Sequence, residues 1–200
     1  NALPKAGQWI RRAGEDIATG QVVLSKGTRL DAIHVGLLAS IGVASVAVAR
    51  RLKVGVMATG SELQSPGNPL KAGQIYNSNE YVWCGLLEAL NVDVLSVGIV
   101  PDNFEATCAA LESLADCDAV ISSGGVSVGE EDHVKPAIEK VGELRSWKVA
   151  MKPGKPIAFG HINRLQGGYS WFFGLPGNPV SSAVAFKLIV KPFLDLLQGQ

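Results

Sequence analysis

The sequence predicts an α/β fold: a mainly parallel sheet with helices on both faces, preceded by a small β-rich segment. From residue 52 onward, short apolar runs alternate with helix-length segments, and the runs are nearly continuous, as in strands buried on both faces. Hydrophobic residues make up 47% of the 200 residues and charged residues 18%, which favours a real core over disorder. Because residues 1–50 differ in texture from the rest, we divide the chain into 1–50 and 51–200.

In residues 1–50, glycines separate short β-prone pieces such as residues 21–24. Asp31 is a good N-cap for an apolar run that ends before Gly42, so a helix is expected there. Residues 43–48 are expected to form a short strand.

Residues 51–200 show the strand and helix alternation directly. Val82, Leu86 and Leu90 recur at helical intervals. Asn178 followed by Pro179 is typical of a helix start, because Asn caps the first turn and Pro fits the first helical position. The expected strands are 53–58, 92–100, 119–122, 147–151, 157–160 and 169–173, and the expected helices are 76–91, 103–115, 132–141 and 178–197.

Composition excludes several classes of protein. Lys and Arg together number 18, as do Asp and Glu, so the net charge is zero and a generally basic nucleic-acid binder is not expected. No apolar run reaches 18 residues, so no membrane span is expected. The three cysteines form no CxxC pair and predict buried thiols in a reducing cytoplasm. The start, Asn-Ala-Leu-Pro without Met, leads us to expect a piece of a longer protein.

Three acidic residues each follow a predicted strand within a few residues: Glu62, Asp102 and Asp132. Ligands of open parallel sheets bind outside the carboxyl ends of the strands, where these side chains can converge. Converging carboxylates repel unless a cation lies among them, and Mg²⁺ takes few carboxylates and bridges to phosphate. The alternative is that each acid is a solvated residue at a helix start.

Positive charge gathers in the last quarter of the chain. Residues 144–194 contain seven Lys or Arg residues and no Asp or Glu. Lys148, Lys152 and Lys155 lie among prolines and a glycine, without a neighbouring counter-charge. Such a cluster favours an anionic ligand over a solvated helix face.

The glycine-rich segment 123–127 offers backbone N–H groups at a predicted helix start, which suits a phosphate, although a tight turn alone would also explain it. The sequence lacks GxGxxG and GxxxxGK[ST], so neither a dinucleotide fold nor a P-loop is supported. Residues 125–129 match G-x-S-x-G. A hydrolase is nevertheless disfavoured, because the acids between Ser127 and His161 all lie close to the serine.

Four ordered motifs resemble the molybdopterin molybdenumtransferases, the MoeA family, which includes the C-terminal domain of gephyrin. They are Thr59-Gly60-Ser61-Glu62-Leu63, the segment Ser122 to Gly129, Lys152-Pro153-Gly154-Lys155-Pro156 and Gly174-Leu175-Pro176-Gly177-Asn178-Pro179. The resemblance covers nearly the whole chain. It implies that residues 51–200 are a molybdopterin-binding domain and residues 1–50 the C-terminal part of a β-rich N-terminal domain. Ser61 stands where the family usually has Asp.

The resemblance implies a reaction in which molybdate is inserted into adenylylated molybdopterin and AMP is released, with Mg²⁺ required. The implied catalytic residues are Asp16, Glu62, Asp102, Asp132, Lys148 and Lys152, and Glu62, Asp102 and Asp132 would hold the metal. The implied cofactor-binding residues are Thr59, Gly60, Ser122, Ser123, Gly124, Gly125, Ser127, Lys155, Pro176, Gly177, Asn178 and Pro179.

The resemblance also implies a homodimer that receives its substrate from the preceding adenylyltransferase. Two alternatives stay open: a gephyrin-like scaffold that anchors a receptor segment, and a related molybdopterin adenylyltransferase. The adenylyltransferases are less similar around Lys148 to Lys155 and around the turn at residues 174–179.

Overall fold

The computed structural model describes residues 3–123, 133–148 and 156–199. The chain divides into two compact units, Asn1–Val48 with Gly199–Gln200, and Ala49–Gln198. Within the described residues no helix is long and apolar enough to cross a membrane.

The described part of the first unit contains one helix, α1 (Ala32–Ser40). The Asp31 side chain caps α1 by accepting hydrogen bonds from the backbone N–H groups of Ile33 and His34. Gly42 follows with φ of 81°, a conformation that favours glycine at a helix end. The strand expected at residues 43–48 is wrong, since none of the described residues 3–50 is in a strand. Its β-prone residues find no partner strand there, and a strand needs one to satisfy its backbone.

The second unit is built on a six-stranded sheet with the order β4-β1-β5-β8-β7-β6. Strands β4, β1, β5 and β8 run parallel, and β7 is antiparallel to both β8 and β6. The α/β prediction is therefore confirmed. The strands are β1 (Lys53–Thr59), β4 (Asp93–Val100), β5 (Ala119–Ser123), β6 (Gly142–Lys148), β7 (Pro156–Asn163) and β8 (Tyr169–Leu175), and a separate ribbon pairs β2 (Leu63–Gln64) with β3 (Ile75–Tyr76).

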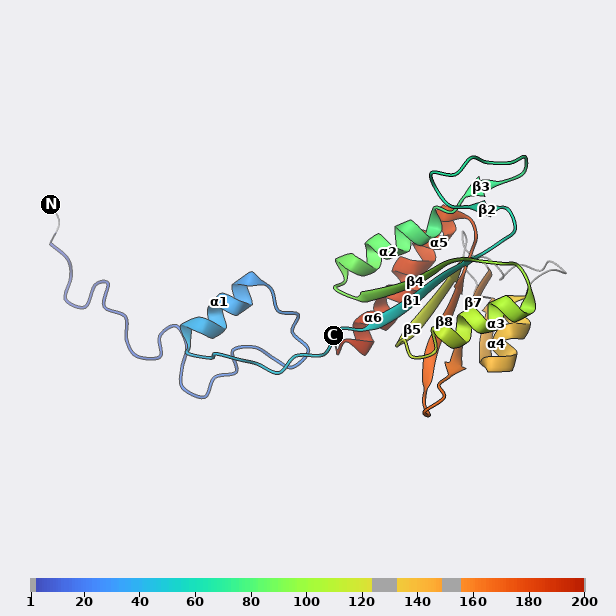
Figure 1. Ribbon diagram of the computed structural model, residues 1–200. Coiled ribbons are helices and arrows are strands. Elements are labelled where there is room, and N and C mark those ends of the chain that lie inside the picture. The colour runs from blue at the N-terminus through green and yellow to red at the C-terminus, as the bar shows by residue number, and fades with distance from the viewer. Residues whose placement is uncertain (1–2, 124–132, 149–155, 200) are drawn as a thin grey trace. The chain divides into compact units, whose positions relative to one another are not determined.

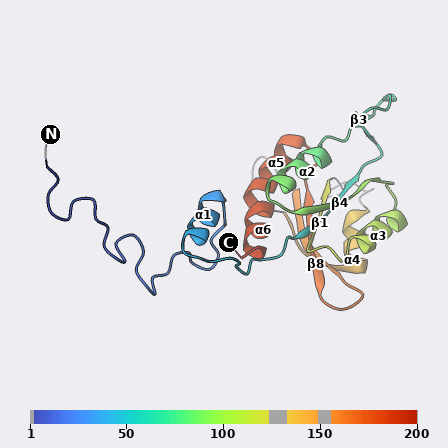
Figure 2. The same cartoon turned by 60° about the vertical axis from the view of Figure 1, so that its left-hand side comes forward.

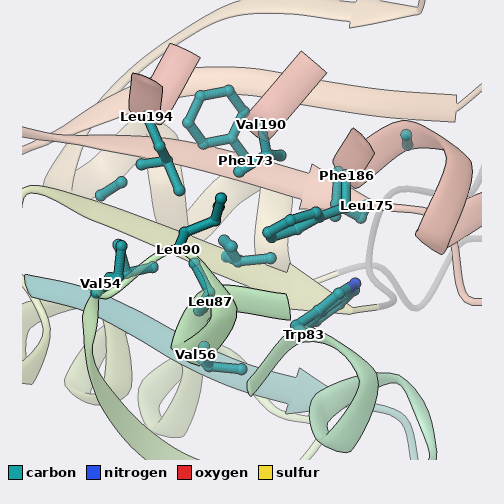
Figure 3. Packing of buried hydrophobic residues seen from close by; sticks show 14 of the residues in the cluster. Val54, Val56, Trp83, Leu87, Leu90, Phe173, Leu175, Phe186, Val190 and Leu194 are labelled. Atoms are coloured by element: carbon teal, nitrogen blue, oxygen red, sulfur yellow. The ribbon is translucent and has the colours of Figure 1, made fainter. Parts of the chain in front are cut away.

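Helices cover both faces of this sheet. They are α2 (Asn79–Ala89), α3 (Phe104–Ser113), α4 (Val134–Val141), α5 (Pro179–Ala185) and α6 (Lys191–Leu197). Figures 1 and 2 show α2, α5 and α6 on one face and α3 and α4 on the other. Each face has its own hydrophobic cluster. Trp83 and Phe186 belong to the first (Figure 3), and Leu111 and Phe172 to the second.

The expected final helix, 178–197, is interrupted by a π-helical segment, Phe186–Val190. Within it the Lys191 N–H donates to the Phe186 carbonyl, five residues back. Pro192 follows directly and has no N–H to donate, so regular α-helical bonding cannot pass through this position. The strand expected at 147–151 begins earlier, at Gly142, because residues 142–148 pair with β7.

Candidate functional site

The candidate site lies where the sheet changes its direction of winding. Strands β1 and β5 are neighbours, but the next helix after β1 is α2 on one face and the next described helix after β5 is α4 on the other. In open α/β sheets, ligands bind outside the carboxyl ends of such a strand pair. The carboxyl ends of β1, β4, β5, β6 and β8 all lie at this edge.

At the end of β1, Thr59 is buried and its Oγ1 donates to the Ser123 carbonyl at 3.1 Å, which ties β1 to β5. Gly60 follows with φ of 145°. This backbone conformation favours glycine, and a Cβ here would lie 2.6 Å from Oε2 of Glu62, the movable end of that side chain. The Glu62 carboxylate therefore folds back over Gly60, next to the end of β1.

Glu62 is also fixed through its backbone. Its carbonyl accepts a hydrogen bond of 2.8 Å from the Ile75 N–H, at the base of the β2–β3 ribbon. The Glu62 side chain is exposed. The backbone that carries this carboxylate at the edge of the sheet is thus fixed by Gly60 before it and by the hydrogen bond to Ile75.

Asp102 lies at the same edge, after β4. Val100, the last residue of β4, pairs with Thr59 of β1, so the chain reaches Asp102 and Glu62 within a few residues of paired positions. Asn103 then caps α3 by accepting a 2.8 Å hydrogen bond from the Ala106 N–H. Asp102 is exposed. The structure brings these two predicted carboxylates to one edge of the sheet.

At the end of β5, Ser122 and Ser123 are almost fully buried. The Ser122 Oγ has no hydrogen-bond partner in the described part of the chain. Buried hydroxyl groups are normally paired, so the Ser122 Oγ, at the carboxyl end of β5, is a candidate to bind a ligand. The predicted residues Gly124, Gly125, Ser127 and Asp132 follow and lie outside the described residues, as do Lys152 and Lys155.

The lysine side of the site is represented by Lys148, the last residue of β6. Because β6 runs parallel to β8, Lys148 ends its strand at the same edge as Glu62. In the strand order β6 stands four places from β1, which is about 19 Å at the usual strand spacing. A ligand that contacts both strand ends must therefore be long.

After β8, Pro176 is buried and Gly177, Asn178 and Pro179 are exposed. The Asn178 side chain caps α5 by accepting a 3.1 Å hydrogen bond from the Ser181 N–H, with Pro179 at the first helical position, as predicted. This turn stands at the carboxyl edge, between the strand ends that carry the carboxylates and the lysine.

The sequence analysis overlooked two buried asparagines at the start of α2. Asn77 is 3% exposed and Asn79 8% exposed. The Asn77 Nδ2 donates to Glu80 at 2.5 Å, and the other Glu80 oxygen accepts from Ser96 Oγ. The run Tyr-Asn-Ser-Asn at the start of the expected helix 76–91 was a usable signal, since polar residues clustered where an element begins commonly line a site.

Asp16 lies in the first unit, where it accepts a 2.7 Å hydrogen bond from the exposed Arg11. No group of three His, Cys, Asp or Glu side chains suited to a metal is found among the described residues. Asp132 is not one of those residues, so the three-carboxylate site stays a prediction.

Comparisons with known proteins find family models that match both parts of the chain. Residues 55–196 match the model of the "Probable molybdopterin binding domain", and residues 1–42 match the "MoeA N-terminal region (domain I and II)". A molybdopterin molybdenumtransferase of Haemophilus influenzae is 50% identical over 99% of this chain and 48% of its own length. Gephyrin of Dictyostelium discoideum is 36% identical over 98% of this chain and 30% of its own length.

Among solved structures, the MoeA protein of Pyrococcus horikosii superposes with a TM-score of 0.79 at 36% identity, covering 93% of this chain and 45% of that one. The chain thus spans about half the length of relatives such as the Haemophilus transferase.

Proposed function

From the premise that the chain belongs to the MoeA family of molybdopterin-binding proteins, we propose that it inserts molybdate into adenylylated molybdopterin and releases AMP. The relatives named molybdopterin molybdenumtransferase support this reaction, with 50% identity over nearly the whole chain in the Haemophilus protein. The observation that carries the proposal is the position of Glu62, Asp102 and Lys148 at the ends of three strands on one edge of the sheet.

The spacing of these groups supports an extended, polyanionic substrate. Carboxylates follow β1 and β4, and Lys148 ends β6, about 19 Å from β1 by strand spacing. A pterin joined to a nucleotide through phosphates can reach from one end of the edge to the other. Lys148, Lys152 and Lys155 would neutralise its anionic oxygens, and Ser122, Ser123 and the glycines after them would line it.

Glu62, Asp102 and Asp132 would hold Mg²⁺. Hard carboxylate oxygens are the protein ligands that this ion prefers, and neither Glu62 nor Asp102 is in an ion pair within the described part of the chain. When bound, Mg²⁺ supplies positive charge that stabilises the charge developing on a phosphoryl oxygen. Thr59 and Gly60 hold the Glu62 backbone in place, and Asp16 stays a predicted catalytic residue.

We further propose a cytoplasmic homodimer that receives its substrate from an adenylyltransferase. Free cysteines agree with a reducing compartment: Cys108 and Cys117 are buried and Cys84 is half-buried. Burial raises the pKa of all three thiols, which keeps them protonated and unreactive.

Replacing Glu62 by Gln, or Asp102 by Asn, tests the reaction. Each change removes a carboxylate charge with little change of shape, so molybdate-dependent formation of the cofactor should fall by about a hundredfold or more. Glu105→Gln is the matched control, because Glu105 is an exposed acid in the first turn of α3, close to the same edge. Wild-type turnover in both site variants would reject the proposal.

A second candidate, a gephyrin-like scaffold, is favoured by the 36% identity to the Dictyostelium protein. A scaffold would bind a receptor peptide whether or not nucleotide is present. Calorimetric titration of the chain with peptide and with adenylylated molybdopterin separates the two functions. Tight peptide binding without a nucleotide signal would favour the scaffold.

A further inference from the structure

A buried amide joins the start of α2 to the turn that precedes α5. The Asn79 Nδ2 donates a 2.8 Å hydrogen bond to the Gly177 carbonyl, 98 residues further along the chain. Asn79 is 8% exposed, whereas Gly177 and Asn178 are exposed at the carboxyl edge of the sheet. A buried side chain therefore fixes an exposed piece of backbone beside the candidate site.

The planarity of the peptide bond gives this contact a further consequence. In a trans peptide, the carbonyl of one residue and the N–H of the next point in opposite directions. With the Gly177 carbonyl held toward α2, the Asn178 N–H must point away from α2. That N–H has no acceptor within the described part of the chain. The result is an oriented backbone donor on an exposed turn.

The hydrogen bond from Asn79 to the Gly177 carbonyl, called the clamp below, is rigid because both of its ends are anchored. Trp83, one turn further along α2, is fully buried in the hydrophobic cluster that also contains Phe186. Figure 3 shows Trp83 and Leu87 in this cluster, with the indole nitrogen at the end of the Trp83 ring away from Leu87. On the other side, the Asn178 side chain is already used to cap α5. The peptide between these anchors has little freedom to rotate.

Stability alone does not account for the asparagine. The Asn79 Oδ1 is buried without a hydrogen-bond partner in the part of the chain that the structure describes, as is the Trp83 Nε1. An unpaired buried carbonyl oxygen costs about 1–3 kcal/mol. An amide at this position is therefore better explained by what its Nδ2 holds than by the stability that it adds.

We propose that Asn79 is a positioning residue, which holds the Gly177–Asn178 peptide so that the Asn178 N–H meets an anionic oxygen of the substrate. This inference rests on the proposed function and adds a residue to it. The oxygen belongs either to a phosphoryl group or to molybdate, since both present the same acceptor chemistry.

Asn79→Asp tests the clamp through pH. The variant keeps Oδ1 and the size of the side chain but loses the donor, so at pH 8 kcat/KM should fall about tenfold, mainly through KM, as expected for one lost hydrogen bond. At lower pH the buried carboxyl is protonated and can donate to the Gly177 carbonyl again. The ratio of variant to wild-type activity should then rise toward one as pH falls toward about 5.5.

The other ionisable groups near this position are accounted for. Glu80, Tyr81, Cys84 and Glu88 lie on α2 itself, α5 has no ionisable side chain, and Lys53 and Asp93 lie at the far ends of β1 and β4. Dividing the activity of the variant by that of wild type at each pH removes the effect of these groups. Asn163→Asp, at the exposed end of β7, is the matched control and should follow wild type at every pH.

Separate KM values for molybdate and for adenylylated molybdopterin identify which oxygen is contacted. An unchanged KM for both substrates, or a loss that does not vary with pH, would overturn the proposal. If Asn79→Asp fails to fold, Asn79→Ala should raise the same KM at every pH. If wild type has no activity, the proposed function fails instead, and a second measurement still decides the clamp. The Asn178 amide resonance should shift with inorganic phosphate or molybdate in wild type and not in Asn79→Ala, and no shift in wild type would reject it.

Discussion

Asp118 shows how a single carboxylate joins segments that are distant in the sequence. Its two oxygens accept hydrogen bonds of 2.7 and 2.5 Å from the Arg50 guanidinium, and one of them accepts a 2.9 Å bond from the Lys53 N–H. Arg164 approaches to 3.8 Å. The hydrogen bond with Arg50, opposed in part by burial, holds the Asp118 pKa below its usual range.

Asp118→Asn should therefore destabilise the chain by about 1–2 kcal/mol at pH 7, a figure kept small because Arg50 is mostly exposed to solvent. The folded-state pKa is lowered, so the stabilisation is present above the unfolded value of about 3.9 and is lost as pH falls through the folded-state pKa. Urea denaturation at pH 7 and at pH 3.5 should show the gap between variant and wild type closing at the lower pH. Asp116→Asn, an exposed neighbour, should show no gap at either pH.

The sequence analysis gave Asp118 no role. Periodicity identifies buried apolar positions, but it does not reveal a partner such as Arg50, 68 residues earlier. The same reason explains why Asn79 was overlooked, since its partner is Gly177. By contrast, the Asp31, Asn103 and Asn178 caps were predictable because each contact spans two or three residues.

At the scale of elements, the packing of α3's C-terminal end against β1 depends on a missing side chain. A Cβ on Gly55 would lie 3.0–3.1 Å from three atoms of Leu114, which is fully buried. Gly55→Ala should therefore destabilise the chain by about 1–3 kcal/mol through overpacking. Gly85→Ala is the control, because no atom lies within 4 Å of a Cβ there, and alanine in α2 should be neutral or slightly stabilising.

A double-mutant cycle with Leu114→Ala checks the cause. If the clash explains the loss, Gly55→Ala should cost less when Leu114 is already shortened, and the two effects will not add. If the two changes in the free energy of unfolding in urea are additive, the loss in Gly55→Ala arises from the backbone of β1 and not from a clash with Leu114.

Elements were predictable where the local pattern agreed with the fold. The strand at 53–58 and the helix at 103–115 were located to within two residues, because their apolar periodicity matches the faces that they bury. The strand expected at 43–48 failed because strand formation needs a partner, which local sequence does not specify.

For the whole molecule, the parallel topology allowed the edge of the candidate site to be predicted before any coordinates. The order of the strands was not predicted from the sequence. In the structure β7 and β6 extend the sheet beyond β8, so Lys148 lies four positions from β1. The strands that lead to Glu62 and Lys148 are separated along the edge, which makes substrate length part of the hypothesis.

The two units differ in how much they bury, and this predicts unequal stability. No described residue of the first unit is buried, and α1 exposes Ile33 at 78% and Val35 at 58%. Both hydrophobic clusters belong to the second unit. Local opening is easiest where few apolar contacts hold the backbone, so α1 should exchange its amide hydrogens at nearly the unfolded rate.

In the same hydrogen-exchange experiment, β1 and β5 should be protected at least about a thousandfold, since their amides exchange only on global unfolding. Limited trypsin digestion should cut first within residues 3–48 and leave a resistant fragment that contains the sheet. Removing residues 1–48 should then leave the midpoint of thermal unfolding within about 4 °C of the intact chain, the shift expected for less than 1 kcal/mol. Equal protection of α1 and β1, or a large drop in that midpoint, would contradict the prediction that the first unit, with no buried residue among those described, is the less stable of the two.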